Sequence, residues 1–168
     1  RNAGYLTQTR SLDDWLREVR GDSCHLMSLS VSRHPAHCYE PQRPLVVLWG
    51  DSFGASLYPG LRDLQKTSSF GLAQLTTSSC PALPAVQSDR QNCNEVNANI
   101  LARLQELQPD AVILFSAWTR PGYGMQDSEV SRKLQSQLST LRQALPSTRL
   151  IVVGPIPRWG RAMRDILT

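Results

Sequence analysis

The sequence predicts an α/β fold of the flavodoxin-like type, a three-layer sandwich around a mostly parallel sheet. Four β-rich apolar runs occur along the chain, at residues 44–49, 70–76, 110–118 and 149–157. Segments between them repeat leucine, isoleucine and valine at helical spacing, and such alternation is typical of parallel sheets with helices on both faces. The chain has 168 residues, of which 40% are hydrophobic and 19% charged, which suits one globular domain.

The first half of the chain predicts two helices around one buried strand. Residues 11–20, SLDDWLREVR, predict a short helix with Ser11 as its N-cap. The polar stretch 21–44 predicts a loop, and the apolar run 44–49 predicts a strand buried on both faces. Residues 53–66 have helical spacing, but Pro59 implies that this helix is kinked or starts late.

The second half continues the alternation of strands and helices. We expect a strand at 70–76, a loop at 77–93, a helix at 94–107, a strand at 110–118, a helix capped by Asp127 or Ser128, and a strand at 149–157. In a parallel sheet the strand-to-helix loops leave at one edge, which is where ligands bind. The loops predicted to converge there are 50–54, 78–94, 118–126 and 154–160.

Composition argues against two classes of partner. The net charge is +4, with Lys66 and Lys133 as the only lysines and the arginines scattered, so nucleic acid is disfavoured. No apolar run approaches the roughly 20 residues that cross a membrane. The first ten residues match neither a signal nor a transit peptide. We therefore expect a mature chain, a cytosolic one, or part of a larger protein.

The four cysteines form two local pairs in the sequence. Cys24 and Cys38 lie in one predicted loop, and Cys80 and Cys93 in another, without the spacing of a zinc site. Two disulfides within these pairs are the favoured interpretation, with free buried thiols as the alternative, although four cysteines allow three pairings. Such bridges would place the domain in an oxidising compartment such as the periplasm.

Ser52 is the candidate nucleophile. The triplet Gly50-Asp51-Ser52 follows a buried strand and precedes a helix, which would expose the hydroxyl beside unpaired backbone N–H groups. The same triplet ending at Ser23 follows a helix instead and predicts a helix-ending turn. The alternative for Ser52 is an ordinary helix cap.

The residues around Ser52 resemble a known family. Gly50-Asp51-Ser52-Phe53 resembles block I of the SGNH (GDSL-type) esterases and acyltransferases. The order of further motifs resembles the SGNH domain fused behind bacterial acyltransferase-3 membrane domains: Leu57-Tyr58-Pro59-Gly60-Leu61, Thr76-Thr77-Ser78-Ser79-Cys80-Pro81, Cys93 with Asn97, Trp118, and Gly154-Pro155-Ile156-Pro157-Arg158-Trp159. The resemblance spans about residues 40–160 and implies the SGNH hydrolase fold.

The resemblance also implies an activity and partners. Such proteins O-acylate, usually O-acetylate, cell-surface glycans such as O-antigen. Their membrane domain delivers the acyl group, and the periplasmic SGNH domain transfers it through a serine. We therefore expect a glycan acceptor, an acyl donor delivered by a membrane acyltransferase domain, no cofactor and no metal. The expected location is the periplasm, tethered to the inner membrane. The alternatives are a stand-alone carbohydrate or lipid esterase, and a non-catalytic glycan-binding module.

The resemblance implies roles at the turn and at the oxyanion site. Ser52 would be the nucleophile and an N–H donor to the oxyanion, while Gly50 and Asp51 would shape the turn. The family glycine of block II falls near Ser79, which is the second donor candidate. The family asparagine of block III is absent, so Asn97 is a third candidate, with a capping or helix-surface role as the alternative.

Side chains on the predicted rim loops complete the candidate site. Trp118, Arg120, Tyr123 and Trp159 would border the substrate, and the aromatic rings could stack on sugars. Core packing is the alternative for at least one of the aromatic residues.

The general base is missing from the family pattern. Family members carry a late Asp-x-x-His motif, but His25, His34 and His37 all precede Ser52. Three explanations stand: the native chain continues, the domain is a non-catalytic glycan-binding module, or an N-terminal histidine acts as the base. A metal site formed by His34, His37 and Cys38 is disfavoured.

The resemblance also suggests a division of the chain. Residues 1–43 would form an N-terminal helix and a disulfide-bearing loop extension. Residues 44–168 would form the SGNH-type domain, without its last strand and helix.

Overall fold

The computed structural model describes residues 11–155, apart from 87, 121 and 124–126. Its sheet has five strands in the order β1-β3-β2-β4-β5. They are β1 (His25–Leu26), β2 (Leu45–Gly50), β3 (Gly71–Thr77), β4 (Ala111–Phe115) and β5 (Arg149–Val152). Every pairing between them is parallel, which confirms the predicted sheet.

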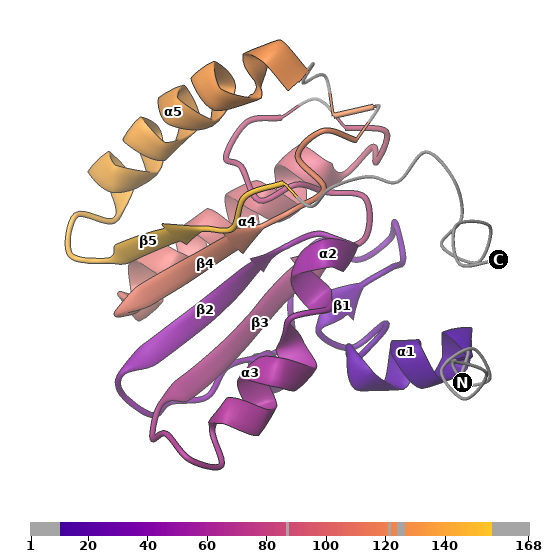
Figure 1. The fold of residues 1–168 in the computed structure, drawn as a ribbon, viewed down its shortest axis with the longest axis vertical. Helices are drawn as coiled ribbons and strands as arrows, with labels where there is room; N and C mark the ends of the chain where they lie inside the picture. The colour runs from indigo at the N-terminus through magenta and orange to yellow at the C-terminus, as the bar shows by residue number, and fades with distance from the viewer. Residues whose placement is uncertain (1–10, 87, 121, 124–126, 156–168) are drawn as a thin grey trace, which may run out of the picture.

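Helices cover both faces of this sheet (Figure 1). They are α1 (Leu12–Glu18), α2 (Ser52–Ala55), α3 (Tyr58–Leu64), α4 (Cys93–Leu107) and α5 (Asp127–Ala144). The predicted three-layer α/β architecture is confirmed. Within the described ranges, no helix has the length and apolar character needed to span a membrane.

The main core lies between the sheet and helices α4 and α5. It contains Trp49 from β2, Leu114 from β4, Ile100 from α4 and Leu141 from α5, all at most 2% exposed. Trp49 is in register with Leu114 across the parallel pair β2–β4, so the two side chains lie on the same face of the sheet. The alternation of strand side chains therefore directs one apolar layer toward α4 and α5.

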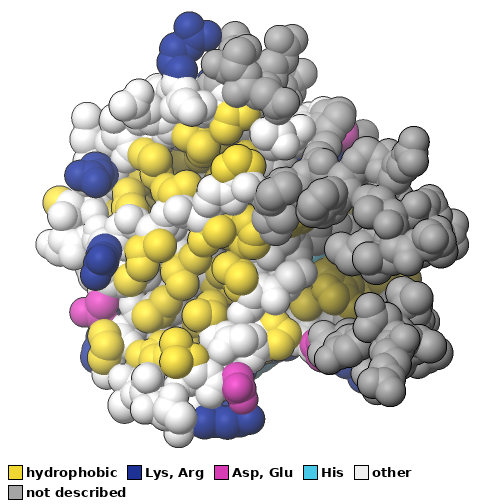
Figure 2. Space-filling model, viewed as in Figure 1, with side chains coloured by type: hydrophobic (Ala, Val, Ile, Leu, Met, Phe, Trp, Pro, Cys, Tyr) yellow, Lys and Arg dark blue, Asp and Glu magenta, His cyan; other side chains and the backbone are white. Residues whose placement is uncertain are grey.

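The opposite face is more polar near α1 and more exposed near β5. The buried Gln74 of β3 donates through Nε2 to the carbonyl of Val19, just after α1, at 2.8 Å. Toward the other edge, Ile151 of β5 is 38% exposed. Figure 2 shows hydrophobic side chains gathered across the middle of the face turned toward the viewer in Figure 1.

The prediction that residues 21–44 form only a loop was wrong in two places. Residues His25 and Leu26 form strand β1 at the sheet edge and pair with β3, and Ala36–Cys38 forms the 3-10 turn η1. A strand of two residues is too short to show a period of two in the sequence. Because β1 pairs with the main sheet, the N-terminal region contributes to the same layer as residues 44–155. The boundary at residue 43 stays a prediction.

The helix predicted at 53–66 consists of two helices. α2 ends at Ala55, and α3 begins at Tyr58 with Pro59 in its first turn. Proline is tolerated there, because a backbone N–H in the first turn has no partner within the helix. The single helix, kinked or starting late, that Pro59 implied is therefore a pair of helices with a break before Tyr58. The strand predicted at 110–118 ends at Phe115, and β5 ends at Val152.

Both predicted disulfides are present. Cys24 is bonded to Cys38, and Cys80 to Cys93. The first bridge joins the residue just before β1 to the end of η1. The second joins the loop after β3 to the first residue of α4. Each bridge therefore fixes a segment near the carboxyl end of the sheet.

Candidate active site

The turn from β2 into α2 requires glycine at position 50. A Cβ atom at Gly50 would lie 2.0 Å from the carbonyl oxygen of Phe115 and 3.0 Å from Cα of Gly54. The first contact is with the backbone of β4, which pairs with β2, so it cannot be relieved by rotating a side chain. Glycine therefore lets the turn that precedes Ser52 lie directly against the end of β4.

Asp51 fixes this turn through three hydrogen bonds. Its Oδ1 accepts from the backbone N–H of Phe53 at 2.8 Å. Its Oδ2 accepts from the N–H of Ala117 at 2.9 Å and from the hydroxyl of Tyr123 at 2.8 Å. The side chain is buried, and burial raises the pKa of Asp51, while these donors act in the opposite direction. The carboxylate thus joins the turn to the loop after β4.

Ser52 occupies the first position of α2. Its side chain is half-buried, and its hydroxyl makes no hydrogen bond to any residue between 11 and 155 that the structure describes. The N–H of a residue at the first helical position has no acceptor within the helix. Ser52 therefore offers a hydroxyl and a backbone donor at the same point of the sheet edge.

The turn after β3 contains an unusual residue. It runs from Thr77 to Cys80 and is closed by a hydrogen bond from Cys80 N–H to Thr77 O at 3.2 Å. Its third residue, Ser79, has φ +55°, a value that glycine normally occupies. The N–H of Ser78 donates to Leu26 O at 2.9 Å. Among the described residues, the N–H of Ser79 has no acceptor, unlike those of Ser78 and Cys80.

The loops after β3 and β4 meet beside Ser79. Arg120 donates through Nη1 to Ser79 Oγ at 2.7 Å, and its guanidinium carbon lies 5.4 Å from the centre of the Tyr123 ring. Arg120 Nη2 is 4.0 Å from Asp89 Oδ2. A Cβ atom at Gly122, whose φ is +95°, would lie 2.2 Å from the same oxygen. The two loops therefore form one packed unit over the carboxyl ends of β3 and β4.

A hollow of about 250 Å³ adjoins this unit on the side of β1. It is lined by Met27, Leu29, Ser78, Ser79, Asp89 and Arg90. The buried Arg90 fixes its wall by donating to the carbonyls of Met27 and Ser28. A larger hollow of about 1030 Å³, lined partly by Glu40, Pro59 and Phe70, lies near the amino ends of β2 and β3, at the edge opposite Ser52.

Comparison with known families identifies the domain. Residues 19–167 match the family model of the SGNH domain that is fused to AT3 domains. The chain belongs to this family.

A solved structure supports the fold of this SGNH domain. The periplasmic domain of a lipopolysaccharide acetyltransferase from Salmonella ser. Paratyphi A superposes with a TM-score of 0.73 at 23% sequence identity. The alignment covers 92% of this chain and 61% of the Salmonella chain, so the SGNH domain spans less than two thirds of that structure's length. A search of curated proteins found no match.

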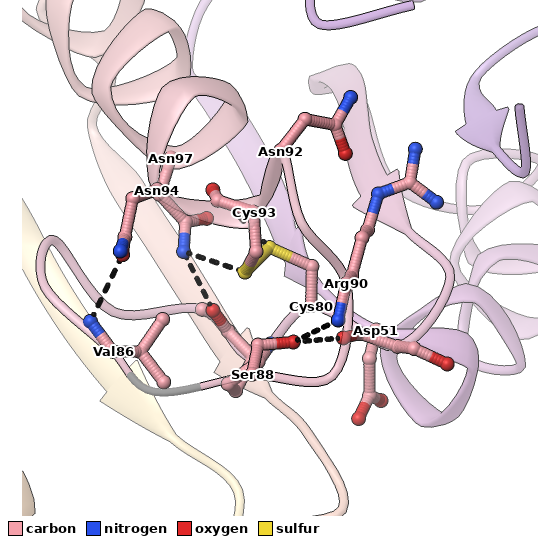
Figure 3. The surroundings of a disulfide bond; sticks show 12 residues. Asp51, Cys80, Val86, Ser88, Arg90, Asn92, Cys93, Asn94 and Asn97 are labelled. Atoms are coloured by element: carbon pink, nitrogen blue, oxygen red, sulfur yellow. Dashed lines mark hydrogen bonds between the residues drawn. A yellow bond between two sulfur atoms is a disulfide. The ribbon is translucent and has the colours of Figure 1, made fainter. Parts of the chain in front are cut away.

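The structure buries Asn97, the third predicted oxyanion donor, inside the SGNH domain. The side chain is 1% exposed. Its Nδ2 donates to Pro81 O at 2.9 Å and contacts Cys93 Sγ at 3.6 Å, while its Oδ1 accepts from Trp49 Nε1 at 3.0 Å. Figure 3 shows this amide directed from α4 toward the Cys80–Cys93 bridge. Its donors are occupied, so we do not retain Asn97 as an oxyanion donor.

Two of the four predicted rim residues are buried. Trp118 is 1% exposed and donates through Nε1 to Val153 O at 2.7 Å, and Tyr123 is 1% exposed with its hydroxyl on Asp51. Neither ring is available to stack on a sugar in this arrangement. Arg120 is half-exposed, and its role at the substrate rim stays a prediction. Trp159 lies outside the described residues.

The three histidines of the SGNH domain are bonded away from Ser52. The ring nitrogens of His25 and His34 contact Thr76 Oγ1 at 3.2 Å and Thr76 O at 3.0 Å. Burial lowers the pKa of both to about 4. His37 Nε2 contacts Ser23 Oγ at 2.7 Å. A base from the N-terminal region is therefore not supported.

The N-terminal loop also bears on the metal site that the sequence disfavours. Cys24, His37 and Cys38 bring possible ligand atoms within 4.8 Å of one another. Both sulfur atoms belong to the Cys24–Cys38 disulfide, so neither is a thiolate that could bind a metal ion.

Sequence reasoning missed Asp89 and Arg90. Both lie in a loop whose sequence has no periodic pattern, and their partners Arg120 and Met27 are far away in the sequence. The spacing of the two cysteines that close this loop was the only available signal.

Proposed function

We propose that this SGNH domain transfers an acyl group, most simply acetyl, to a hydroxyl of a cell-surface glycan through an acyl-enzyme on Ser52. The observation that supports this most is the environment of Ser52. Its hydroxyl is unbonded within the described residues, on a turn that Asp51 fixes. The turn after the neighbouring strand β3 carries a Ser79 N–H that has no acceptor among those residues. A hydroxyl without a bonding partner, on a rigid turn near free N–H donors, is what acyl transfer requires.

The proposed reaction has two steps. Ser52 Oγ attacks the carbonyl carbon of the acyl donor, a base removes the hydroxyl proton, and the leaving group departs with a proton. A sugar hydroxyl then attacks the acyl-enzyme, which forms the sugar ester and restores the hydroxyl of Ser52. The N–H groups of Ser52 and Ser79 would stabilise the negative oxygen in both tetrahedral intermediates. Water in place of the sugar would make the same site an esterase.

We place the general base outside this sequence. His25, His34 and His37 are the only histidines of the chain, and in the structure each is bonded to a residue other than Ser52. The family resemblance assigns the base to a histidine of an Asp-x-x-His motif. Asp51 is not a substitute, because both of its oxygens accept hydrogen bonds that fix the turn.

The proposed partners follow from the family. An AT3 domain would deliver the acyl group. The similar Salmonella domain belongs to a lipopolysaccharide acetyltransferase, which supports acetyl as the group and a glycan as the acceptor. We place the domain in the periplasm at the inner membrane. Two disulfides support an oxidising compartment.

The test compares two serines that follow the same Gly-Asp dipeptide. In the complete protein, expressed in bacteria, the acyl content of the surface glycan is measured by mass spectrometry. Ser52→Ala should abolish acylation, whereas Ser23→Ala, the matched control, should leave it near the wild-type level. Full acylation in the Ser52→Ala protein would contradict the proposal and favour a glycan-binding module.

A further inference from the structure

The conformation of Ser79 is the feature that carries a further inference. A serine with φ +55° is strained, because its Cβ lies close to the neighbouring backbone, and such residues persist only when their surroundings hold them. Glycine at this position would be free of that strain. The sequence thus has serine at a position of the turn that favours glycine.

Contacts from three directions hold Ser79. Its hydroxyl accepts from Arg120 Nη1 at 2.7 Å, and its carbonyl accepts from Ser88 Oγ at 2.6 Å. The following residue, Cys80, is bonded to Cys93 at the start of α4. Only the contact with Arg120 uses the Ser79 side chain. The serine hydroxyl therefore lets Arg120, in the loop after β4, hydrogen-bond to the turn after β3, which glycine at position 79 could not do.

The hydrogen bond from Arg120 would keep the Ser79 N–H in a fixed direction. The N–H groups before and after Ser79, on Ser78 and Cys80, donate to Leu26 O and Thr77 O. Among the described residues, only the Ser79 N–H of this trio has no acceptor. The φ angle of Ser79 is the rotation about its N–Cα bond. The N–H lies in the rigid peptide plane on the N-terminal side of that bond, so the φ angle sets the direction of the N–H relative to the rest of Ser79. Gly50 and Thr76 are in register, so the turns that follow β2 and β3 are neighbours at the sheet edge.

We infer that Arg120 is a positioning residue that holds Ser79 in its left-handed conformation, so that the Ser79 N–H faces the acyl oxygen on Ser52. The inference rests on the proposed acyl transfer and adds to it a residue that acts through another. Arg120 itself lies against the Tyr123 ring, and its Nη2 is 4.0 Å from Asp89 Oδ2. Tyr123 also bonds Asp51, so the same loop orients both the nucleophile turn and the oxyanion turn.

A rescue experiment in the complete protein tests this inference. The readout is the second-order rate at which a fluorophosphonate probe labels Ser52. Arg120→Ala should slow labelling by about 10-fold to 100-fold, somewhat less than the roughly 100-fold to 1000-fold cost of losing an oxyanion donor. Ser79→Gly supplies the reference rate for the double variant, because glycine keeps the backbone N–H but lacks the hydroxyl that Arg120 bonds. Ser79→Gly combined with Arg120→Ala should recover to within about 3-fold of Ser79→Gly alone, because glycine adopts a positive φ without support.

Two results would overturn the inference. A double variant as slow as Arg120→Ala alone would mean that Arg120 contacts the acyl donor or substrate directly. An Arg120→Ala variant as fast as the wild type would mean that Ser79 needs no support from it. Arg62→Ala is the matched control, because Arg62 is also an ion-paired surface arginine but lies on α3, paired with Glu40, and its labelling should be unchanged.

Thermal unfolding separates this inference from the proposed function. Arg120→Ala should lower the Tm of the protein that has Ser79. It should lower the Tm of the Ser79→Gly protein less, because glycine at a positive φ has no backbone strain that Arg120 must offset. If the wild type is not labelled but this coupling is found, the holding role stands and its catalytic purpose fails. Equal losses of Tm in both proteins would overturn the holding role.

Discussion

At the scale of single residues, buried polar side chains orient the site. Asp51 has both oxygens occupied, and two of its three donors come from the loop after β4. Removing one partner from such a buried network leaves the others without a partner, which costs about 1–3 kcal/mol for each unsatisfied group. The position of Ser52 therefore depends on the buried side chains of Asp51 and Tyr123.

The buried pair His25 and His34 predicts a loss of stability in mild acid. The pKa of each is about 4 in the folded protein, because burial disfavours the charged ring, compared with 6.5 when exposed. The unfolded chain therefore binds protons first, so the contribution is complete above pH 6.5 and is lost as the pH falls toward 4. We expect a loss of about 2 kcal/mol per histidine between about pH 7 and about pH 5.

Urea unfolding at neutral pH and at about pH 5 measures this loss. His34→Gln, which keeps a donor that can bond Thr76, should show a smaller change between the two pH values than the wild type. An identical change in both proteins would show that His34 is not a source of the acid sensitivity.

At the scale of elements, close contact between β2, α2 and β4 sets the site. Gly50→Ala forces a Cβ against the backbone of Phe115 and should destabilise the fold by about 2–3 kcal/mol. Gly60→Ala on α3 is the matched control, because a Cβ there meets no atom within 4 Å. It should stabilise the protein by up to about 1 kcal/mol, since alanine favours helices. Equal effects of the two changes in urea unfolding would contradict this difference in packing.

The two disulfides should differ in function although they close loops of similar length. The bridges span 14 and 13 positions, so each contributes about 3 kcal/mol through the unfolded chain. Replacing Cys80 and Cys93 with alanine loosens the turn that holds Ser79 and should slow probe labelling of Ser52. Replacing Cys24 and Cys38 should cost similar stability with a smaller effect on labelling. Measuring both quantities in both variants tests this, and equal slowing would count against it.

At the scale of the whole molecule, the strands were predictable because their side chains are buried by neighbours on both sides. β2, β3 and β4 appear as continuous apolar runs, whereas β1 has two residues and depends on the Cys24–Cys38 bridge and on pairing with β3. In a parallel sheet the loops after the strands leave at one edge, so the position of Ser52 at that edge could be predicted.

Side-chain direction could not be predicted in the same way. The ends of the strands show which loops reach the rim, but they do not show that Trp118 and Tyr123 turn inward to bond Val153 and Asp51. Asn97 likewise faces the core because Trp49, far away in sequence, needs an acceptor for its buried N–H. The positive φ of Ser79 cannot be inferred from the serine itself, and only the family glycine expected near this position indicated a turn that favours glycine.

Whether Ser52 is an activated nucleophile can be decided by mapping a fluorophosphonate adduct on the complete native protein by mass spectrometry. We expect one adduct, on the peptide that contains Ser52, and none on the peptide that contains Ser23. The absence of an adduct on Ser52, in protein that is folded and has both disulfides formed, would contradict the assignment of Ser52 as the nucleophile.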